Sequence, residues 1–176
     1  MKIYSHSKLS TFEQCPYKYK LRYIDKIIPE IEKSIEAHLG TCVHKTLEWL
    51  YYEVKKGNIP TIDETITYYS KIWKEEFKEK FIIVKKELTA KDYFNKGVEF
   101  LLSYYTKNAP FQDGTLELEK KISLKLTEEH EIIGYIDRLA YNKEKDRYEI
   151  HDYKTANTLP NKEMFEKDRQ LALYCN

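Results

Sequence analysis

Apolar residues recur at helical spacing through the first two thirds of the chain. In the segment that follows Gly40, for example, Val43, Leu47, Leu50 and Val54 fall on one face of a helix. Glycine, proline and asparagine lie between such segments, where helices are expected to begin and end. The pattern predicts four helices, over residues 7–26, 41–56, 62–79 and 89–107.

In the last third of the chain the spacing of apolar residues changes from helical to alternating. Alternation is typical of strands with one buried face, and it predicts strands over residues 115–126, 131–141 and 148–155. A short polar linker, 142–146, separates the last two strands, so we expect them to pair as a hairpin. Helical spacing then returns and predicts a final helix over residues 161–175.

The length of the chain and the order of these elements limit the architecture. A chain of 176 residues fits one domain that can bury a core of its own. Helices followed by strands and a further helix predict an α/β fold with a helical N-terminal part. We expect the helical part to span about residues 1–110 and the core that contains the sheet about residues 111–176.

Overall charge does not identify a partner. The formal net charge is +1, with 30 basic and 29 acidic residues, so the whole molecule has no field that attracts nucleic acid. Most of the basic residues are lysines, and together with the 16 tyrosines they are typical of a codon bias rather than of a DNA-binding surface. The local distribution is more informative, because residues 1–26 carry six basic and two acidic side chains.

Several classes of protein are disfavoured by composition. The three cysteines form no C-x-x-C pair, which argues against a zinc knuckle or a disulfide framework and fits a reducing cytosol. No apolar run approaches the ~18 residues that a membrane-spanning helix needs. The first residues also lack the apolar segment of a signal peptide. We therefore expect a cytoplasmic protein with no membrane partner.

The candidate chemistry lies on the last two predicted strands. Asp152 and Lys154 are two residues apart, a spacing that places both side chains on one face of a strand. The neighbouring strand of the hairpin contributes Asp137. Carboxylate oxygens are ligands for hard cations such as Mg²⁺. A lysine beside them can orient or deprotonate a water, or stabilise the anion that forms in phosphodiester cleavage.

Both acids are expected to lie in apolar rows. Asp152 shares its face with Tyr148 and Ile150, which should point into the core. Asp137 shares its face with three apolar residues, Ile133, Tyr135 and Leu139. An acid in such a row needs a compensating partner. The alternatives are a surface ion pair between Asp152 and Lys154, which would contribute little, and a solvated acid at Asp137.

Five short motifs, in a fixed order, resemble one nuclease family. Glycine precedes histidine by four residues at Gly40–His44, and it precedes aspartate by three at Gly134–Asp137. The D-x-K triplet Asp152–Lys154 follows, and then glutamine precedes tyrosine by four at Gln170–Tyr174. The opening segment Ser5–Tyr23 resembles the first helix of the same family. Together these motifs resemble the RecB-like branch of the PD-(D/E)XK nuclease superfamily, although Ile136 replaces the proline of the superfamily's name.

The resemblance implies a fold, a metal and roles for individual residues. The fold would have a mixed central sheet flanked by helices, with a restriction-endonuclease-like core. The metal would be Mg²⁺ or Mn²⁺, and Lys154 would be the catalytic lysine. Its ligands would be the side chains of His44, Asp137 and Asp152 and the backbone carbonyl of Tyr153. The final helix would support the site and the DNA through Gln170 and Tyr174.

The expected function is divalent-metal-dependent hydrolysis of DNA. By analogy with the family, an exonuclease that acts on single strands or DNA ends is favoured over a sequence-specific enzyme. The products would carry a 5′-phosphate and a 3′-hydroxyl, and a helicase, a CRISPR system or a repair complex would be the partner. The alternative is a catalytically inactive domain for nucleic-acid binding or assembly. Inactive relatives tend to lose an acid or the lysine, and Asp137, Asp152 and Lys154 are all present.

The N-terminal segment allows two interpretations. In residues 17–23 tyrosines alternate with the cations Lys18, Lys20 and Arg22. Such a pattern suits single-stranded DNA, where a stacked base contributes ~1–3 kcal/mol. It equally suits an amphipathic helix that buries its tyrosines and exposes its cations.

Three further features remain open at the level of sequence. Cys15 is either a small helix residue or, as in several family members, a ligand of an iron–sulfur cluster. The family places three more cysteines after the glutamine–tyrosine helix, and this chain ends one residue after Cys175. The chain is therefore either naturally short or a fragment. Finally, Glu119 is an acid on the first predicted strand that can join the metal site through a water.

Overall fold

The structure is a computed structural model, and it describes residues 1–27, 34–77, 81–83, 85, 87–112 and 114–155. The predicted helix 161–175 lies outside the described residues, as do Gln170 and Tyr174. The chain divides into two compact units, which are described separately. The first comprises Met1–Glu30, Glu119–Ile136 and Asn157–Asn176, and the second comprises Ile31–Leu118 and Asp137–Ala156.

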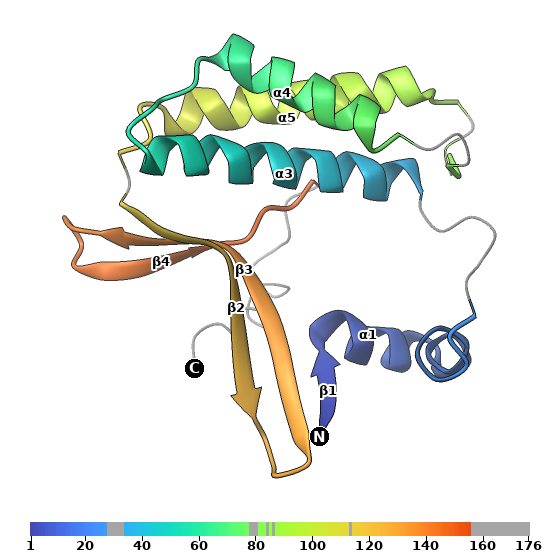
Figure 1. Ribbon diagram of the computed structural model, residues 1–176. Helices are drawn as coiled ribbons and strands as arrows, with labels where there is room; N and C mark the ends of the chain where they lie inside the picture. The colour runs from blue at the N-terminus through green and yellow to red at the C-terminus, as the bar shows by residue number, and fades with distance from the viewer. Residues whose placement is uncertain (28–33, 78–80, 84, 86, 113, 156–176) are drawn as a thin grey trace. The chain divides into compact units, whose positions relative to one another are not determined.

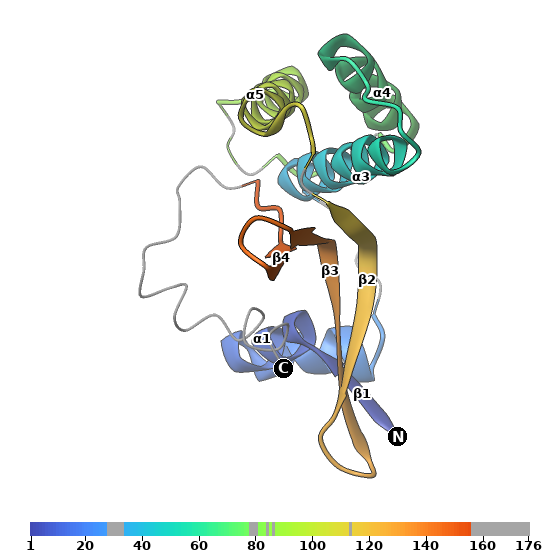
Figure 2. The same cartoon turned by 90° about the vertical axis from the view of Figure 1, so that its left-hand side faces the viewer.

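Three helices of the second unit, α3, α4 and α5, pack against one another (Figures 1 and 2). Each begins at a hydroxyl residue whose side chain accepts a hydrogen bond from a backbone N–H of the first turn, as helix N-caps do. These residues are Ser34, Thr61 and Thr89, and the last two form complete capping boxes. The helices span Ile35–Lys55 (α3), Ile62–Glu75 (α4) and Ala90–Asn108 (α5).

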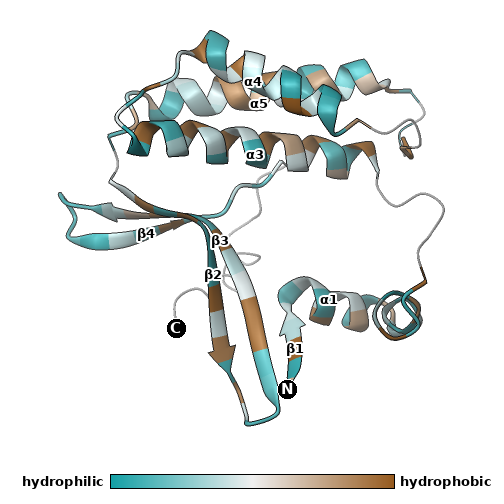
Figure 3. Ribbon diagram, viewed as in Figure 1, coloured by the Kyte–Doolittle hydropathy of each residue, from teal (hydrophilic) through white to brown (hydrophobic). Residues whose placement is uncertain are grey.

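The apolar face of α3 forms the centre of the helical core. Ile35, Leu39, Val43 and Leu47 recur at helical spacing and are all buried. Apolar positions recur among polar ones along all three helices (Figure 3). At helical spacing, such a pattern gives each helix one apolar face for the core. From α4 and α5 the same core receives buried aromatic and aliphatic side chains, namely Tyr69, Trp73, Tyr93 and Leu101.

The predicted hairpin is present in the second unit. Strand β3 spans His130–Asn142 and strand β4 spans Arg147–His151. The two are antiparallel, with Asn142 opposite Arg147 and Arg138 opposite His151. Strand β2, Thr115–Lys125, is the other neighbour of β3 in the sheet (Figure 1). All three strands predicted from the sequence are present, although β4 ends at His151 and is shorter than predicted.

The first unit adds a strand that the sequence did not predict. Strand β1, Lys2–Ser5, pairs in parallel with the beginning of β3, and Lys2 lies opposite His130. Since β3 is parallel to β1 and antiparallel to β4, the sheet is mixed. The fold is thus α/β with a mixed sheet and helices, as expected of a restriction-endonuclease-like core. No helix in the described part of the chain is long and apolar enough to span a membrane.

The single helix predicted over residues 7–26 is wrong. The segment instead forms α1 (His6–Gln14), α2 (Pro16–Tyr19) and a π-helical turn, η1 (Lys20–Ile24). Cys15 between α1 and α2 is extended, with φ −161° and ψ 100°. The cause is Pro16, because the ring of a proline disfavours helical geometry in the preceding residue. Pro16 then occupies the first turn of α2, where its missing N–H is tolerated.

Three other predictions about local structure also need correction. Gly40 does not precede a helix but lies inside α3, which begins at Ile35. Strand β4 ends at His151, so the D-x-K triplet follows the strand instead of lying on it. The apolar rows proposed for the acids are wrong as well, because Tyr135 is 50% exposed and Tyr148 is 69% exposed. On β3 the buried neighbours of Asp137 are Ile136 and Arg138, where tertiary packing overrides simple alternation.

Candidate metal centre

Helix α3 and strand β3 bring His44 and Asp137 into contact. The Nδ1 atom of His44 lies 3.5 Å from Oδ1 of Asp137, and the Asp137 side chain is only 11% exposed. Gly40 lies one helical turn before His44, and a Cβ atom at this position would be 3.2 Å from Oγ1 of Thr155. The absence of a side chain at Gly40 therefore allows the segment after β4 to approach α3 closely.

The second oxygen of Asp137 is held by the middle residue of the D-x-K triplet. The backbone N–H of Tyr153 donates a 2.6 Å hydrogen bond to Oδ2 of Asp137. The ring of Tyr153 also packs edge-on against the imidazole of His44, with 5.8 Å between the ring centroids and an angle of 84°. Tyr153 thus contacts both His44 and Asp137, and it fixes the segment that carries Asp152 and Lys154 beside them.

Asp152 and Lys154 form an ion pair, the contact that the sequence analysis gave as the alternative to a catalytic role. Nζ of Lys154 lies 2.5 Å from Oδ2 of Asp152. The Asp152 side chain is 13% exposed, whereas that of Lys154 is 56% exposed. An exposed pair would contribute little, but here the acid is covered and the amine remains accessible to a substrate.

The electrostatics of His44 reflect this acidic environment. Burial by itself lowers the pKa of the imidazole, because it penalises the charged form. The hydrogen bond and charge of Asp137, a hydrogen bond with the Tyr153 backbone and the charge of Asp152 act in the opposite direction. Their combined effect raises the pKa of His44 above its ordinary value. The two carboxylates therefore favour the protonated form of His44.

These groups form a donor set that fits a divalent cation. Two covered carboxylates and one imidazole supply oxygen and nitrogen ligands, the combination that suits Mn²⁺ and, with waters, Mg²⁺. A divalent cation would compensate the negative charge of the two carboxylates. The contact between His44 and Asp137 is observed, whereas the place of Asp152 as a further ligand of the same metal stays a prediction.

The remaining predicted residues lie elsewhere. Lys18, Lys20 and Arg22 are exposed in the first unit, and Gln170 and Tyr174 are outside the described residues. In α2, Sγ of Cys15 accepts a hydrogen bond of 3.4 Å from the backbone N–H of Lys18, and so caps this short helix. Glu119 is assigned to the first unit, so its participation at the metal centre stays a prediction.

Exposed aromatic and cationic side chains occur together in the first unit. Tyr17 is 67% exposed and Phe12 is 52% exposed, whereas Tyr19 and Tyr23 are half-buried and pack against each other, with ring centroids 5.2 Å apart. The guanidinium of Arg22 lies 5.5 Å from the centre of the Tyr23 ring. Among the described residues, this segment fits both interpretations of its sequence in part, since some rings pack and others face outward.

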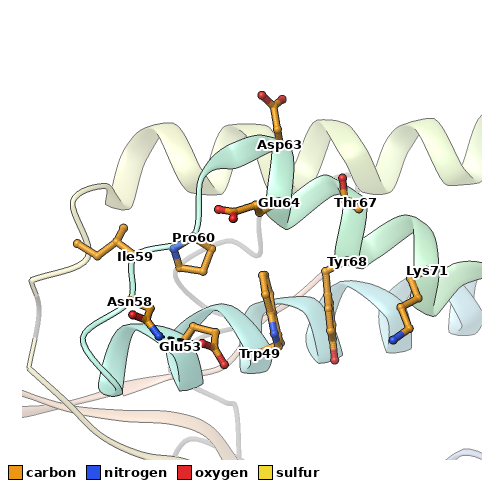
Figure 4. Close-up of a pocket in the computed structure, with 10 residues that line it drawn as sticks. All are labelled: Trp49, Glu53, Asn58, Ile59, Pro60, Asp63, Glu64, Thr67, Tyr68 and Lys71. Carbon is orange, nitrogen blue, oxygen red and sulfur yellow. Dashed lines mark hydrogen bonds between the residues drawn. The ribbon is translucent and has the colours of Figure 1, made fainter.

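A pocket between α3 and α4 is separate from these residues (Figure 4). Its volume is about 690 Å³, and its wall includes Trp49 and Tyr68, whose rings stack 4.3 Å apart. Two of its acids already have partners, since Glu53 pairs with Lys56 and Glu64 closes the capping box of α4. None of the predicted metal ligands lines this pocket.

One buried residue near the metal centre was missed by the sequence analysis. Arg138 has no exposed surface and follows Asp137 directly on β3. Its Nε donates a 3.2 Å hydrogen bond to the hydroxyl of Tyr153. The signal in the sequence was a cation between Asp137 and Leu139 in a strand that otherwise reads as largely apolar.

A mixed sheet with helices is consistent with the restriction-endonuclease-like fold, and two acids, an imidazole and a lysine are the side chains expected at its metal site. The family model of the PD-(D/E)XK nuclease superfamily matches residues 3–176, so the chain belongs to this superfamily of metal-dependent hydrolytic nucleases. A comparison with curated proteins gave no match.

Proposed function

We propose that this protein is a divalent-metal-dependent DNA nuclease of the RecB-like branch, with residues 1–176 acting as one nuclease domain. The observation that carries the proposal is the convergence of His44 and Asp137 with the segment of Asp152 and Lys154. The first three would hold the cation together with the backbone carbonyl of Tyr153. Each of these residues comes from a motif that resembles the RecB-like branch.

The metal explains why the protein gathers two carboxylates in a covered site. When bound, Mg²⁺ or Mn²⁺ lowers the pKa of a water and neutralises charge on the scissile phosphate. Asp137 and Asp152 would bind and orient the cation, and unprotonated His44 would supply a nitrogen ligand. The Tyr153 N–H keeps Asp137 in one orientation, since it occupies Oδ2.

Lys154 is the proposed catalytic residue that does not bind the metal. An ammonium group has donors only, so it cannot be a ligand in its charged form. Its amine lies against Asp152 and is more than half exposed, so it can reach a phosphate oxygen or the attacking water. We assign it to positioning that water and stabilising the charge that develops in hydrolysis.

The substrate we propose is single-stranded DNA or a DNA end. Lys18, Lys20 and Arg22 would contact the phosphates, and Gln170 and Tyr174 would support the site from the final helix. By the same resemblance, the partner is a helicase, a CRISPR system or a repair complex in the cytoplasm. An iron–sulfur cluster at Cys15 would need further cysteine ligands. Among the described residues, the other cysteine is Cys42, which is buried in α3.

A catalytically inactive DNA-binding or assembly domain is the alternative. It would keep the fold and bind nucleic acid without cleaving it. The covered acids and the accessible Lys154 favour the enzyme over this alternative. A surface that only binds DNA phosphates has no need of buried carboxylates, which would repel them.

The test is a degradation assay on single-stranded and linear double-stranded DNA. We expect cleavage with Mg²⁺ or Mn²⁺, no cleavage with excess EDTA, and no cleavage by Lys154→Ala. Lys143→Ala, on the exposed β3–β4 turn, is the control and should cleave like the wild type. DNA binding without cleavage under all metal conditions would support the alternative instead.

A further inference from the structure

Arg138 is a fully buried cation whose contacts lead to the metal centre. Its Nε donates to the hydroxyl of Tyr153 at 3.2 Å, and its Nη1 donates to Oγ1 of Thr115 at 3.2 Å. The guanidinium also lies over the ring of Tyr51, 4.1 Å from its centre. A buried cation is expensive unless it is paired and hydrogen-bonded, so these contacts need a reason beyond filling space.

Tyr153 connects Arg138 to the proposed ligands. Its hydroxyl accepts from Arg138, and its backbone N–H donates to Asp137. Its ring lies between the imidazole of His44 and the ring of Tyr104, whose centroid is 5.6 Å away. Tyr153 is therefore anchored at both ends, and a shift at its hydroxyl would displace the ring against His44 and the amide against Asp137.

We infer that Arg138 is a positioning residue for the metal centre: by its hydrogen bond to the Tyr153 hydroxyl, it holds the D-x-K segment against Asp137 and His44 and so sets the affinity for the divalent cation. The inference rests on the proposed function, and it adds a specific role for two side chains that are not themselves metal ligands. Outer partners that orient metal ligands commonly change metal affinity by about 10- to 100-fold when they are removed.

The geometry of arginine suits this role better than that of lysine. Its planar group presents several N–H donors in fixed directions, so Tyr153, Thr115 and the Tyr51 ring can be contacted together. A lysine would keep the charge but offers a single flexible ammonium. Arg138→Lys should therefore weaken the affinity for the divalent cation less than Arg138→Met does.

The decisive variant is Tyr153→Phe, which keeps the ring and the backbone and removes only the hydroxyl. Calorimetric titration with Mn²⁺ should show about 10-fold weaker binding than the wild type. Hydrogen exchange of the metal-free protein should show faster exchange of the amide of residue 153, because its hydrogen bond to Asp137 is loosened. The second readout needs neither metal nor catalytic activity.

The matched control is Tyr69→Phe. Tyr69 is fully buried and donates its hydroxyl to the backbone carbonyl of Phe94, and it lies in the helical core. This variant should lose some thermal stability while it keeps the wild-type Mn²⁺ affinity and the wild-type exchange rate at residue 153. A comparison of the melting temperatures of Tyr69→Phe and Tyr153→Phe then distinguishes a general loss of stability from a loss of positioning at the metal centre.

A double variant, Arg138→Met with Tyr153→Phe, separates the two roles further. Because Arg138 and Tyr153 are in direct contact, the losses of thermal stability caused by the two single changes should not add in this double variant. Its Mn²⁺ affinity should remain weak, since the positioning bond is still missing. If Arg138→Met does not fold, the pair of tyrosine variants decides the question without it.

The outcomes distinguish this inference from the proposed function. If the wild type binds Mn²⁺ and Tyr153→Phe binds it equally well, the positioning role is refuted and the proposed function stands. The same holds if Tyr69→Phe weakens binding as much as Tyr153→Phe does. If the wild type itself does not bind Mn²⁺, the proposed function fails, and the inference fails with it.

Discussion

The backbone N–H of Tyr153 donates a 2.6 Å hydrogen bond to Oδ2 of Asp137, which lies 16 residues earlier in the chain. This bond joins the segment that follows β4 to strand β3, and so connects the D-x-K and G-x-x-D motifs. Oδ1 of the same carboxylate faces His44. This bond uses only the backbone of Tyr153. The side chain of Tyr153 acts separately, through its ring, which contacts His44, and its hydroxyl, which contacts Arg138.

Asp152 and Lys154 should have separable roles. We expect Asp152→Ala to lose both Mn²⁺ binding and DNA cleavage, because it removes a proposed ligand. Lys154→Ala should lose cleavage but keep Mn²⁺ binding within about threefold, since the charged amine is no ligand and its removal also eliminates repulsion of the cation.

Calorimetric titration and a cleavage assay on the same two variants measure this separation. Lys145→Ala, on the β3–β4 turn, is the control and should match the wild type in both assays. The assignment of roles is wrong if the Lys154 variant cannot bind metal or if the Asp152 variant binds it normally.

Metal affinity should increase with pH through the titration of His44. The pKa of His44 is raised above its ordinary value of about 6.5, and a metal ligand must be unprotonated. Mn²⁺ binding should therefore release a proton and strengthen as the pH rises through the raised pKa. Titrations in buffers of different ionisation enthalpy measure the number of protons released, and a pH-independent affinity would contradict the role of His44.

The stability of the metal-free protein should show the opposite trend. A group whose pKa is raised by folding stabilises the protein fully below its unfolded pKa and loses that contribution as the pH rises through its folded pKa. The difference in unfolding free energy between the wild type and His44→Gln should thus be largest at acidic pH and should shrink at alkaline pH. Urea denaturation in the presence of EDTA, over a pH series, provides the measurement.

Local patterns predicted the parts of the fold that depend on neighbours in sequence. The β3–β4 hairpin followed from two alternating segments and a short polar linker, and α5 followed from its helical spacing. The contact between Asp152 and Lys154 also followed from their spacing, although they lie after β4 rather than on it.

The parts that were missed depend on tertiary contacts. The pairing of β1 with β3 joins residues near position 2 to residues near position 130, and no local pattern marks it. Gly40 lies within α3, where Thr155 approaches it closely, and it does not mark a helix boundary. Likewise, the burial of Arg138 depends on Tyr51, Thr115 and Tyr153, which come from other segments of the chain.

Gly97 should be intolerant of even the smallest side chain. A Cβ atom at this position would lie 2.0 Å from the hydroxyl oxygen of Tyr69 and 2.8 Å from Cδ1 of Leu39. Tyr69 cannot move aside easily, because its buried ring stacks on Phe94 with 5.2 Å between the centroids. Overpacking costs ~1–3 kcal/mol, and the severity of these contacts places Gly97→Ala near the upper value.

Alanine also favours a helix over glycine by about 1 kcal/mol, so the expected net loss is about 2 kcal/mol of unfolding free energy. Urea denaturation measures it. Ser103→Ala, at an exposed position of the same helix, is the control and should change the stability by less than ~0.5 kcal/mol. An equal or higher stability of Gly97→Ala would show that the helices can separate more freely than their packing indicates.

The cations of the N-terminal segment should determine how DNA affinity depends on salt. Lys18, Lys20 and Arg22 are all exposed, so they can displace counterions from phosphates. Each contact with a single strand contributes ~0.7 to the slope of log affinity against log salt concentration. Replacing all three by alanine should therefore flatten this slope by about 2.

The control must also lose three positive charges, because the chain is rich in lysine throughout. Lys71, Lys74 and Lys91 serve this purpose, since they are exposed on α4 and α5 and belong to none of the nuclease motifs. Fluorescence anisotropy with a labelled oligonucleotide over a salt series measures both triple variants. If both flatten the slope equally, the N-terminal segment is not a specific DNA contact, and Tyr19 and Tyr23 are better interpreted as packing residues because their rings already contact each other.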